Sequence, residues 1–128
     1  RTFFLNDRQR TIYEFFKDKV HKYMDKCKDG QSIKELKNNF YKELKRGLDK
    51  EFNFLTGPLL HGVGIKVYEF PHLAHPFITD GFIKNLKEGM VLAFTNIGVY
   101  SKNGWGIRYE ETFLVTKNKP VIFTLDNL

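Results

Sequence analysis

The chain has 128 residues, which suits one domain with one hydrophobic core. Hydrophobic residues make up 41% of it, and this excludes an intrinsically disordered protein. Apolar runs are short, so no transmembrane helix is expected, and the opening residues RTFFLNDRQR lack the apolar core of a signal peptide. A single cysteine, Cys27, cannot form an internal disulfide. We therefore expect an intracellular, cytoplasmic protein without membrane contact.

The net charge of +6 arises entirely in the first 50 residues. They hold 14 Lys and Arg against 8 Asp and Glu, whereas residues 51–128 hold 7 of each. A basic cluster can indicate a nucleic-acid surface, but these lysines alternate with acids and lack interleaved aromatic residues. The pattern favours an ordinary solvated helix surface, so nucleic acid is not the expected partner.

Two helices are expected in this basic part of the chain. The first is predicted from about residue 7 to 28, with Asn6 or Asp7 as its N-cap and Gly30 at its end. The second is predicted to begin at a capping box formed by Ser32 and Glu35. Apolar residues recur at three- and four-residue spacing in both helices, which predicts buried faces: Ile12, Phe16, Val20, Tyr23, Met24 and Cys27 in the first, and Ile33, Leu36, Phe40, Leu44 and Leu48 in the second.

After residue 50 the periodicity becomes that of strands. We interpret residues 51–60 as a connection, residues 64–70 as a strand, and residues 71–81 as an irregular loop with two prolines. Gly89 is predicted to turn the chain into another strand, and residues 101–106 are predicted to form a turn. Residues 106–116 alternate with a period of two, and a short strand is expected at 121–125. Residues 1–128 thus predict a single α+β domain, with two helices packed on one face of a mostly antiparallel curved sheet.

An arginine and a glutamate lie side by side on one face of the predicted strand at residues 106–116. A structural ion pair or a solvated face would explain Arg108 and Glu110. Alternatively, Glu110 is a metal ligand, and Arg108 fixes the strand or a substrate. The alternation predicts the faces as follows: Ile107, Tyr109, Phe113 and Val115 on one, and Arg108, Glu110 and Thr112 on the other.

Histidines raise the same choice between structural and functional readings. His61 precedes Gly62 and Gly64, which lack Cβ atoms, so the backbone beside it could approach a ligand closely. A histidine that is simply hydrogen-bonded or exposed is the alternative. For His72 and His75 the two neighbouring prolines predict a solvent-exposed loop with no shared face, and we expect no metal there.

Four segments of the chain carry motifs. They are RTFF with the helix after it, HGVGIKVYEFP (residues 61–71), LKEGMVLAFTNIGVY (86–100) and GWGIRYEETFLVT (104–116). Together they resemble the pita-bread metallopeptidases, which include Xaa-Pro aminopeptidases, prolidases and methionine aminopeptidases. The last three are similar to that family's His-Gly-Ile-Gly…His-Glu-x-Pro segment, its Gly-Met-Val strand leading into Glu-Pro-Gly-x-Tyr, and its Gly-x-Arg-x-Glu-Asp strand. The resemblance runs nearly end to end and implies a partial pita-bread (creatinase/aminopeptidase) fold.

The resemblance also implies a chemistry. In this family two Asp, one His and two Glu hold two divalent metals, which activate a bridging water and polarise the scissile carbonyl. By position, His61 corresponds to the histidine ligand and Glu110 to the last glutamate ligand. Arg108, Tyr68 and Trp105 are the residues expected to line the substrate cleft, with Trp105 as a packing residue at its rim.

Several family positions are altered in this chain. The other glutamate falls at Asn96 or Thr95, depending on which glycine is aligned. Tyr68 replaces the histidine of His-Glu-x-Pro, and Gly57 replaces a further histidine. Both aspartates would precede residue 1. Because two cations close together need several anionic oxygens, we expect no metal, or a single manganese, cobalt or zinc ion if aspartates lie upstream.

Three functions remain open on this basis. The first is a peptidase-like protein that has lost activity and keeps a cleft for a peptide or protein segment. The second is the carboxyl-terminal part of an active metal-dependent Xaa-Pro aminopeptidase or dipeptidase. The third is an interaction module of the histone-chaperone type, with its lysine-rich helices against an acidic partner. The absent first half of the curved sheet predicts a homo-oligomer or a separate amino-terminal half that pairs with the open edge.

Overall fold

The computed structural model describes residue 4 and residues 6–55, 58–65, 69–73, 83–94 and 98–123. Helices α1 (Asp7–Met24) and α2 (Ile33–Gly47) come first and lie against each other. The strands follow in the order β1 (Phe52–Leu55), β2 (Leu60–Gly62), β3 (Glu69–Leu73), β4 (Val91–Phe94), β5 (Gly98–Ser101), β6 (Gly106–Arg108), β7 (Glu111–Leu114) and β8 (Val121–Ile122). This order confirms the predicted α+β class.

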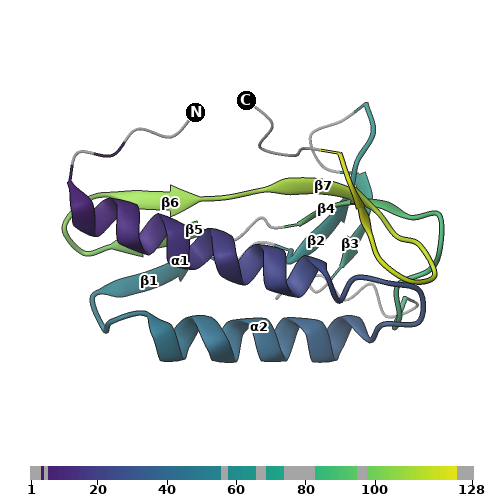
Figure 1. Cartoon of the computed structure of the whole chain (residues 1–128), viewed down its shortest axis with the longest axis horizontal. Helices are drawn as coiled ribbons and strands as arrows, with labels where there is room; N and C mark the ends of the chain where they lie inside the picture. Colours follow the sequence, from purple (N-terminus) through teal and green to yellow (C-terminus); the bar gives the residue numbers. More distant parts are fainter. Residues whose placement is uncertain are drawn as a thin grey trace.

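The strands form two antiparallel sheets. The smaller has the order β1-β5-β6, and the larger has the order β3-β2-β4-β7-β8. Figure 1 shows β6 and β7 running end to end as one long segment, with α1 lying along it. Residues 109 and 110 between these two strands belong to neither ladder, so the predicted single strand at 106–116 is in fact two strands in two sheets.

Helix α1 begins as predicted and ends early. The side chain of Asn6 accepts a hydrogen bond from the Gln9 amide, which is the predicted N-cap. The helix stops at Met24, four residues before the predicted end, because the next segment bonds elsewhere: the Asp29 amide donates to the carbonyl of Thr116, and the Gly30 amide donates to that of Leu86. Gly30 does have a positive φ of 80°, but within the turn between the helices.

Helix α2 follows its sequence pattern closely. Ser32 is the N-cap, and its hydroxyl accepts from the Glu35 amide at 3.3 Å. All five residues of the predicted apolar face are buried. Phe40 lies at the centre, with its ring 5.3 Å from that of Tyr23 in α1 and 5.4 Å from that of Phe94 in β4, both edge-on. The two helices and the larger sheet therefore share one core.

Three further sequence interpretations after residue 50 are wrong. Gly64 and Ile65, predicted in the strand at 64–70, lie outside both β2 and β3. Residues 52–55 are strand β1 rather than a connection, because they pair with β5 and bury Phe52. Residues 71–73, predicted as loop, belong to β3. Pro71 is tolerated there because β3 is an edge strand, where a missing amide costs no ladder bond. By contrast, the predicted turns at Gly89 and Gly104 are confirmed, with φ of 89° and 84°.

Neither of the two described helices combines the length and the apolar character that crossing a membrane requires.

The central position of Phe40 generates the first prediction. Phe40→Ala removes a fully buried ring, so it should lower the free energy of unfolding by about 3–5 kcal/mol in chemical denaturation. Phe123→Ala is the matched control, because Phe123 is 55% exposed and should change stability by about 0.5 kcal/mol or less. Equal losses in the two variants would contradict the proposed core.

A second prediction concerns the carboxylate that joins the helices. Lys22 donates to Glu43 at 2.9 Å and Tyr23 donates at 2.8 Å, and these two hydrogen bonds lower the pKa of Glu43 from 4.5 to about 2. Because the folded pKa is the lower one, the stabilisation is present above pH 4.5 and is lost as the pH falls through about 2. In acid titrations of unfolding free energy, Glu43→Gln should remove this dependence. Glu14→Gln, at an exposed glutamate of α1, should leave it in place.

Candidate functional site

Strand pairing places His61 and Glu110 on the same face of the larger sheet. His61 of β2 is opposite Ala93 of β4, which in turn is opposite Thr112 of β7. Directly opposite residues point to the same face, and Glu110 is two residues from Thr112, so all four share it. Ala93 lies on β4, between β2 and β7, and its small side chain leaves room for the imidazole to approach Glu110. Its Nε2 lies 3.8 Å from the Glu110 Oε1 atom.

The orientation of the His61 ring is set by its own backbone. Nδ1 lies 2.9 Å from the carbonyl oxygen of Gly62, which can only accept, so Nδ1–H donates; in the neutral ring Nε2 then carries the lone pair. The ring is only 4% exposed. Metal-binding histidines in proteins typically donate their second nitrogen to a carbonyl or carboxylate in this manner. The tautomer and the direction of Nε2 both suit a ligand role.

Glu110 connects His61 to Arg108. Its Oε1 faces the imidazole, and its Oε2 is 3.8 Å from the Arg108 Nη2 atom. Both charged side chains are partly exposed, at 38% for Glu110 and 46% for Arg108. An ion pair between such exposed groups contributes about 0–1 kcal/mol to stability. The pair therefore explains little of the stability of the fold. The Glu110 carboxylate can leave Arg108 for another cation at a small cost in free energy.

The donor set is compatible with one divalent cation and insufficient for two. A separation of 3.8 Å between nitrogen and oxygen allows both to reach one ion at the usual ligand distances of about 2.0–2.2 Å. Within the described ranges, however, no group of three or more His, Cys, Asp or Glu side chains converges. One imidazole and one carboxylate supply a single formal negative charge, so the further ligands would have to come from elsewhere.

Gly64, three residues after His61, packs closely against another segment. A Cβ atom on Gly64 would clash with the carboxylate of Glu69, the glutamate of the YEFP segment. This glycine therefore lets the turn after β2 fold against the start of β3. The close approach of a ligand to this backbone, expected from the sequence, stays a prediction, and the group that lies beside Gly64 in the structure is the Glu69 carboxylate.

Several predicted site residues lie outside the described residues. They are Tyr68, Thr95, Asn96, Gly57 and His75. His72, predicted in an exposed loop, instead belongs to β3, where its backbone is paired directly with His61. The predicted loop is therefore wrong at this residue, because Pro71 is tolerated in β3 at the edge of the sheet.

Trp105 lies in the turn between β5 and β6, away from the histidine. Its ring packs edge-on against Phe52 of β1 at a centroid distance of 5.5 Å. Four residues lie between it and Glu110, and an extended chain over these five steps spans about 16 Å. The packing role is thus visible, whereas its predicted place at a cleft rim stays a prediction.

Sequence reasoning missed a buried polar cluster behind this site. Glu111 is 4% exposed and accepts a hydrogen bond from the Tyr109 hydroxyl, which also lies 2.9 Å from His21 Nε2. The period-two alternation contains the signal, because Glu111 falls on the same face as Tyr109 and Phe113. A charged residue on an otherwise apolar strand face implies a buried partner.

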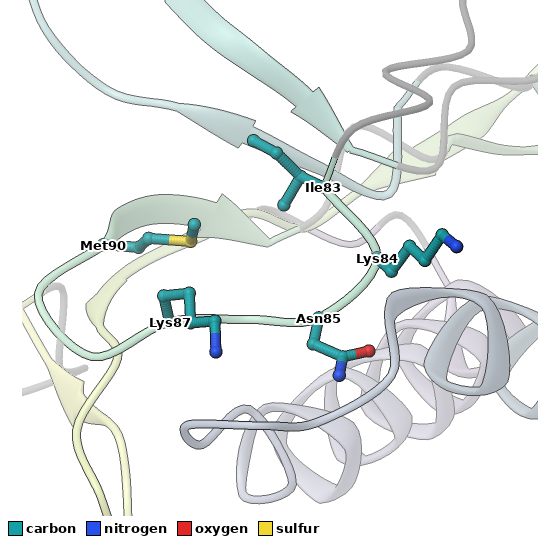
Figure 2. A pocket seen from close by; sticks show the side chains of 5 residues that line it. All are labelled: Ile83, Lys84, Asn85, Lys87 and Met90. Atoms are coloured by element: carbon teal, nitrogen blue, oxygen red, sulfur yellow. The ribbon is translucent and has the colours of Figure 1, made fainter.

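A hollow elsewhere on the molecule is lined by other residues. Its volume is about 300 Å³, and Figure 2 shows its lining side chains, Ile83, Lys84, Asn85, Lys87 and Met90, along the loop that precedes β4. None of them belongs to the pair His61 and Glu110. The candidate site on the larger sheet is therefore distinct from this hollow.

Comparison with solved structures agrees with the topology. A prolidase from Pyrococcus furiosus superposes with a TM-score of 0.73 and 30% identity, over 96% of this chain and 34% of that one. An X-Pro aminopeptidase from Thermotoga maritima gives a TM-score of 0.76 at 24% identity, again over 96% of this chain and 33% of the other. The second similarity shows the shared fold alone. The architecture is the pita-bread fold of these peptidases.

Sequence relatives point the same way. An Xaa-Pro dipeptidase from Pyrococcus furiosus is 32% identical over 116 residues, which are 88% of this chain and 30% of that protein. An uncharacterized peptidase from Methanocaldococcus jannaschii is 35% identical over 126 residues, which are 92% of this chain and 33% of that one. The chain thus spans about a third of the length of its relatives. Residues 1–117 match the metallopeptidase family M24, so the chain belongs to that family as an Xaa-Pro peptidase-like member.

Proposed function

We propose that this chain forms the histidine- and glutamate-bearing side of a cleft that binds a peptide or protein segment and holds at most one divalent metal ion. On this proposal, dinuclear peptidase activity is lost. The observation that carries it is the 3.8 Å approach of His61 Nε2 to Glu110 Oε1, two ligand-type atoms from strands separated by β4. Together with the relatives named Xaa-Pro dipeptidases, this pair favours a peptidase-derived site over a purely structural histidine.

The limit of one ion follows from charge. Two dications a few ångströms apart repel each other strongly, and carboxylates between them are needed to offset that repulsion and their dehydration. The position of the second family glutamate holds Asn96 or Thr95, whose oxygens are neutral. With two aspartates from outside this chain, His61 and Glu110 would complete a four-ligand set for manganese, cobalt or zinc. When bound, that ion would polarise a carbonyl or lower the pKa of a water.

The remaining cleft residues would serve binding. Arg108 is partly exposed beside Glu110 and presents a planar guanidinium, which suits a carboxylate or carbonyl of a peptide. Tyr68, in place of the family histidine, supplies a hydroxyl and an aromatic ring, but no base that titrates near neutral pH. On this proposal the cleft still binds a peptide. Cleavage is lost because Asn96 or Thr95 replaces the second metal-binding glutamate and Tyr68 replaces the family histidine.

An active Xaa-Pro dipeptidase or aminopeptidase is the second candidate. It is favoured by three relatives at 30–34% identity that are named Xaa-Pro dipeptidases, of which this chain covers about a third. In such a protein the missing ligands would come from the rest of the polypeptide. Cleavage of an Xaa-Pro dipeptide by the full-length protein with manganese or cobalt, abolished by His61→Ala, would establish this candidate and overturn the first.

The proposed site predicts the stoichiometry of metal binding. In isothermal titration of the full-length protein with manganese, cobalt or zinc, we expect no more than one ion per chain. His61→Ala and Glu110→Gln should each lower the affinity for that ion at least tenfold, because even residues that hydrogen-bond to metal ligands contribute about 10–100-fold to metal affinity. His75→Ala and Glu88→Gln are the matched controls and should bind as the unmodified protein does. Two bound ions per chain would contradict the proposal.

Restoring the lost groups provides the converse prediction. Asn96→Glu or Thr95→Glu, each combined with Tyr68→His in the full-length protein, adds a carboxylate and an imidazole where the family has them. One of the two double variants should bind a second ion and cleave an Xaa-Pro dipeptide that the unmodified protein leaves intact. Asn96→Gln with Tyr68→Phe is the uncharged control. Failure of both restored variants, with one ion still bound, would show that these substitutions are not what separates the chain from its active relatives.

A further inference from the structure

The cluster of His21, Tyr109 and Glu111 connects helix α1 to the strand segment that carries Glu110. The Tyr109 hydroxyl donates its one proton to Glu111, so the phenolic oxygen is the acceptor for His21, whose Nε2 lies 2.9 Å away. The same Nε2 is 3.6 Å from the Glu111 carboxylate. The three side chains therefore form a hydrogen-bonded chain from the last turn of α1 into the sheet.

Burial makes this chain of hydrogen bonds a strong constraint. Glu111 is 4% exposed and Tyr109 is 8% exposed. A carboxylate in such surroundings is costly unless donors satisfy it, so conformations that break the Tyr109 hydrogen bond are disfavoured. Packing on the ring adds to the effect. Tyr13 meets the Tyr109 ring edge-on at 5.8 Å, and the Lys17 ammonium lies 5.9 Å from its centre, so three residues of α1 hold the ring.

At this point the chain passes from the smaller sheet to the larger one. Strand β6 ends at Arg108 in the smaller sheet, and β7 begins at Glu111 in the larger one. Residues 109 and 110 lie between the two registers. With Tyr109 and Glu111 both directed into the core, extended geometry requires Glu110 to point to the opposite face, where His61 lies.

We propose that His21, Tyr109 and Glu111 are positioning residues that hold the Glu110 carboxylate beside His61. None of the three would touch substrate or metal. The proposal deepens the function proposed above and rests on it for its consequence in metal binding, although the positioning itself can be measured without metal. Helix α1 acquires a role in the site through this cluster, from the partly exposed side that carries His21.

Nuclear magnetic resonance of the metal-free, full-length protein tests the positioning directly. A nuclear Overhauser contact is expected between the imidazole protons of His61 and the side chain of Glu110. Tyr109→Phe keeps the ring and its packing and deletes only the hydroxyl, so it should weaken or abolish that contact. Tyr13→Phe deletes the same group from the adjacent ring and should preserve it. Glu111→Gln, which keeps an acceptor oxygen for Tyr109, should preserve it as well.

Metal titration then distinguishes failure of this inference from failure of the proposed function. If the unmodified protein binds one ion, Tyr109→Phe should lower the affinity for that ion about tenfold, and Tyr13→Phe should leave the affinity unchanged. An unchanged His61–Glu110 contact in Tyr109→Phe overturns the inference, whatever the metal result. Loss of the contact in Tyr109→Phe, in a protein that binds no metal, supports the positioning and overturns the metal-binding function. A lower melting temperature in both Tyr variants, with the contact intact, also counts against positioning.

Discussion

The antiparallel ladder β2-β4-β7 is the constraint on which the candidate site depends. It places two residues about fifty positions apart on one sheet face, with only a small side chain, Ala93, between them. The other face of the same strands carries Leu60, Phe94 and Phe113, which pack under both helices. A slip of one residue in this register would exchange the two faces and bury the site residues in the core. Core packing and site geometry are therefore secured by the same hydrogen bonds.

Retention of the scaffold does not imply retention of the chemistry. The core needs apolar residues at particular spacings, and this chain has them throughout its helices and strands. A pair of dications needs negative charge at particular points, and the described part of the chain brings only Glu110 toward His61. Loss of a carboxylate from a site on a rigid sheet need not disturb the core. On the function proposed above, this is how a member of a metallopeptidase family keeps the fold while its metal site is reduced.

Sequence periodicity anticipated the elements whose partners are local. The capping box at Ser32, the apolar face of α2 and the turns at Gly89 and Gly104 all depend on neighbours within a few residues, and all are confirmed. Predictions failed where the bounds of an element depend on hydrogen bonds to a distant segment. Residues 52–55 become a strand because β5 lies beside them, and α1 ends at Met24 because residues 29 and 30 bond to distant carbonyls. The break at residues 109–110 reflects a transfer between two sheets, which a continuous alternation does not reveal.

The sequence by itself determined the α+β class, the buried faces of both helices, the family, and the candidates His61 and Glu110. These follow from local spacing and from motifs in order along the chain. Only the tertiary structure decided that these two side chains meet, that His72 is a strand residue opposite His61, and that Glu111 is held by Tyr109 and His21. The physical reason is that a contact between distant segments depends on sheet register and on the packing of a helix over it. Neither of these is encoded in the spacing of residues along one strand.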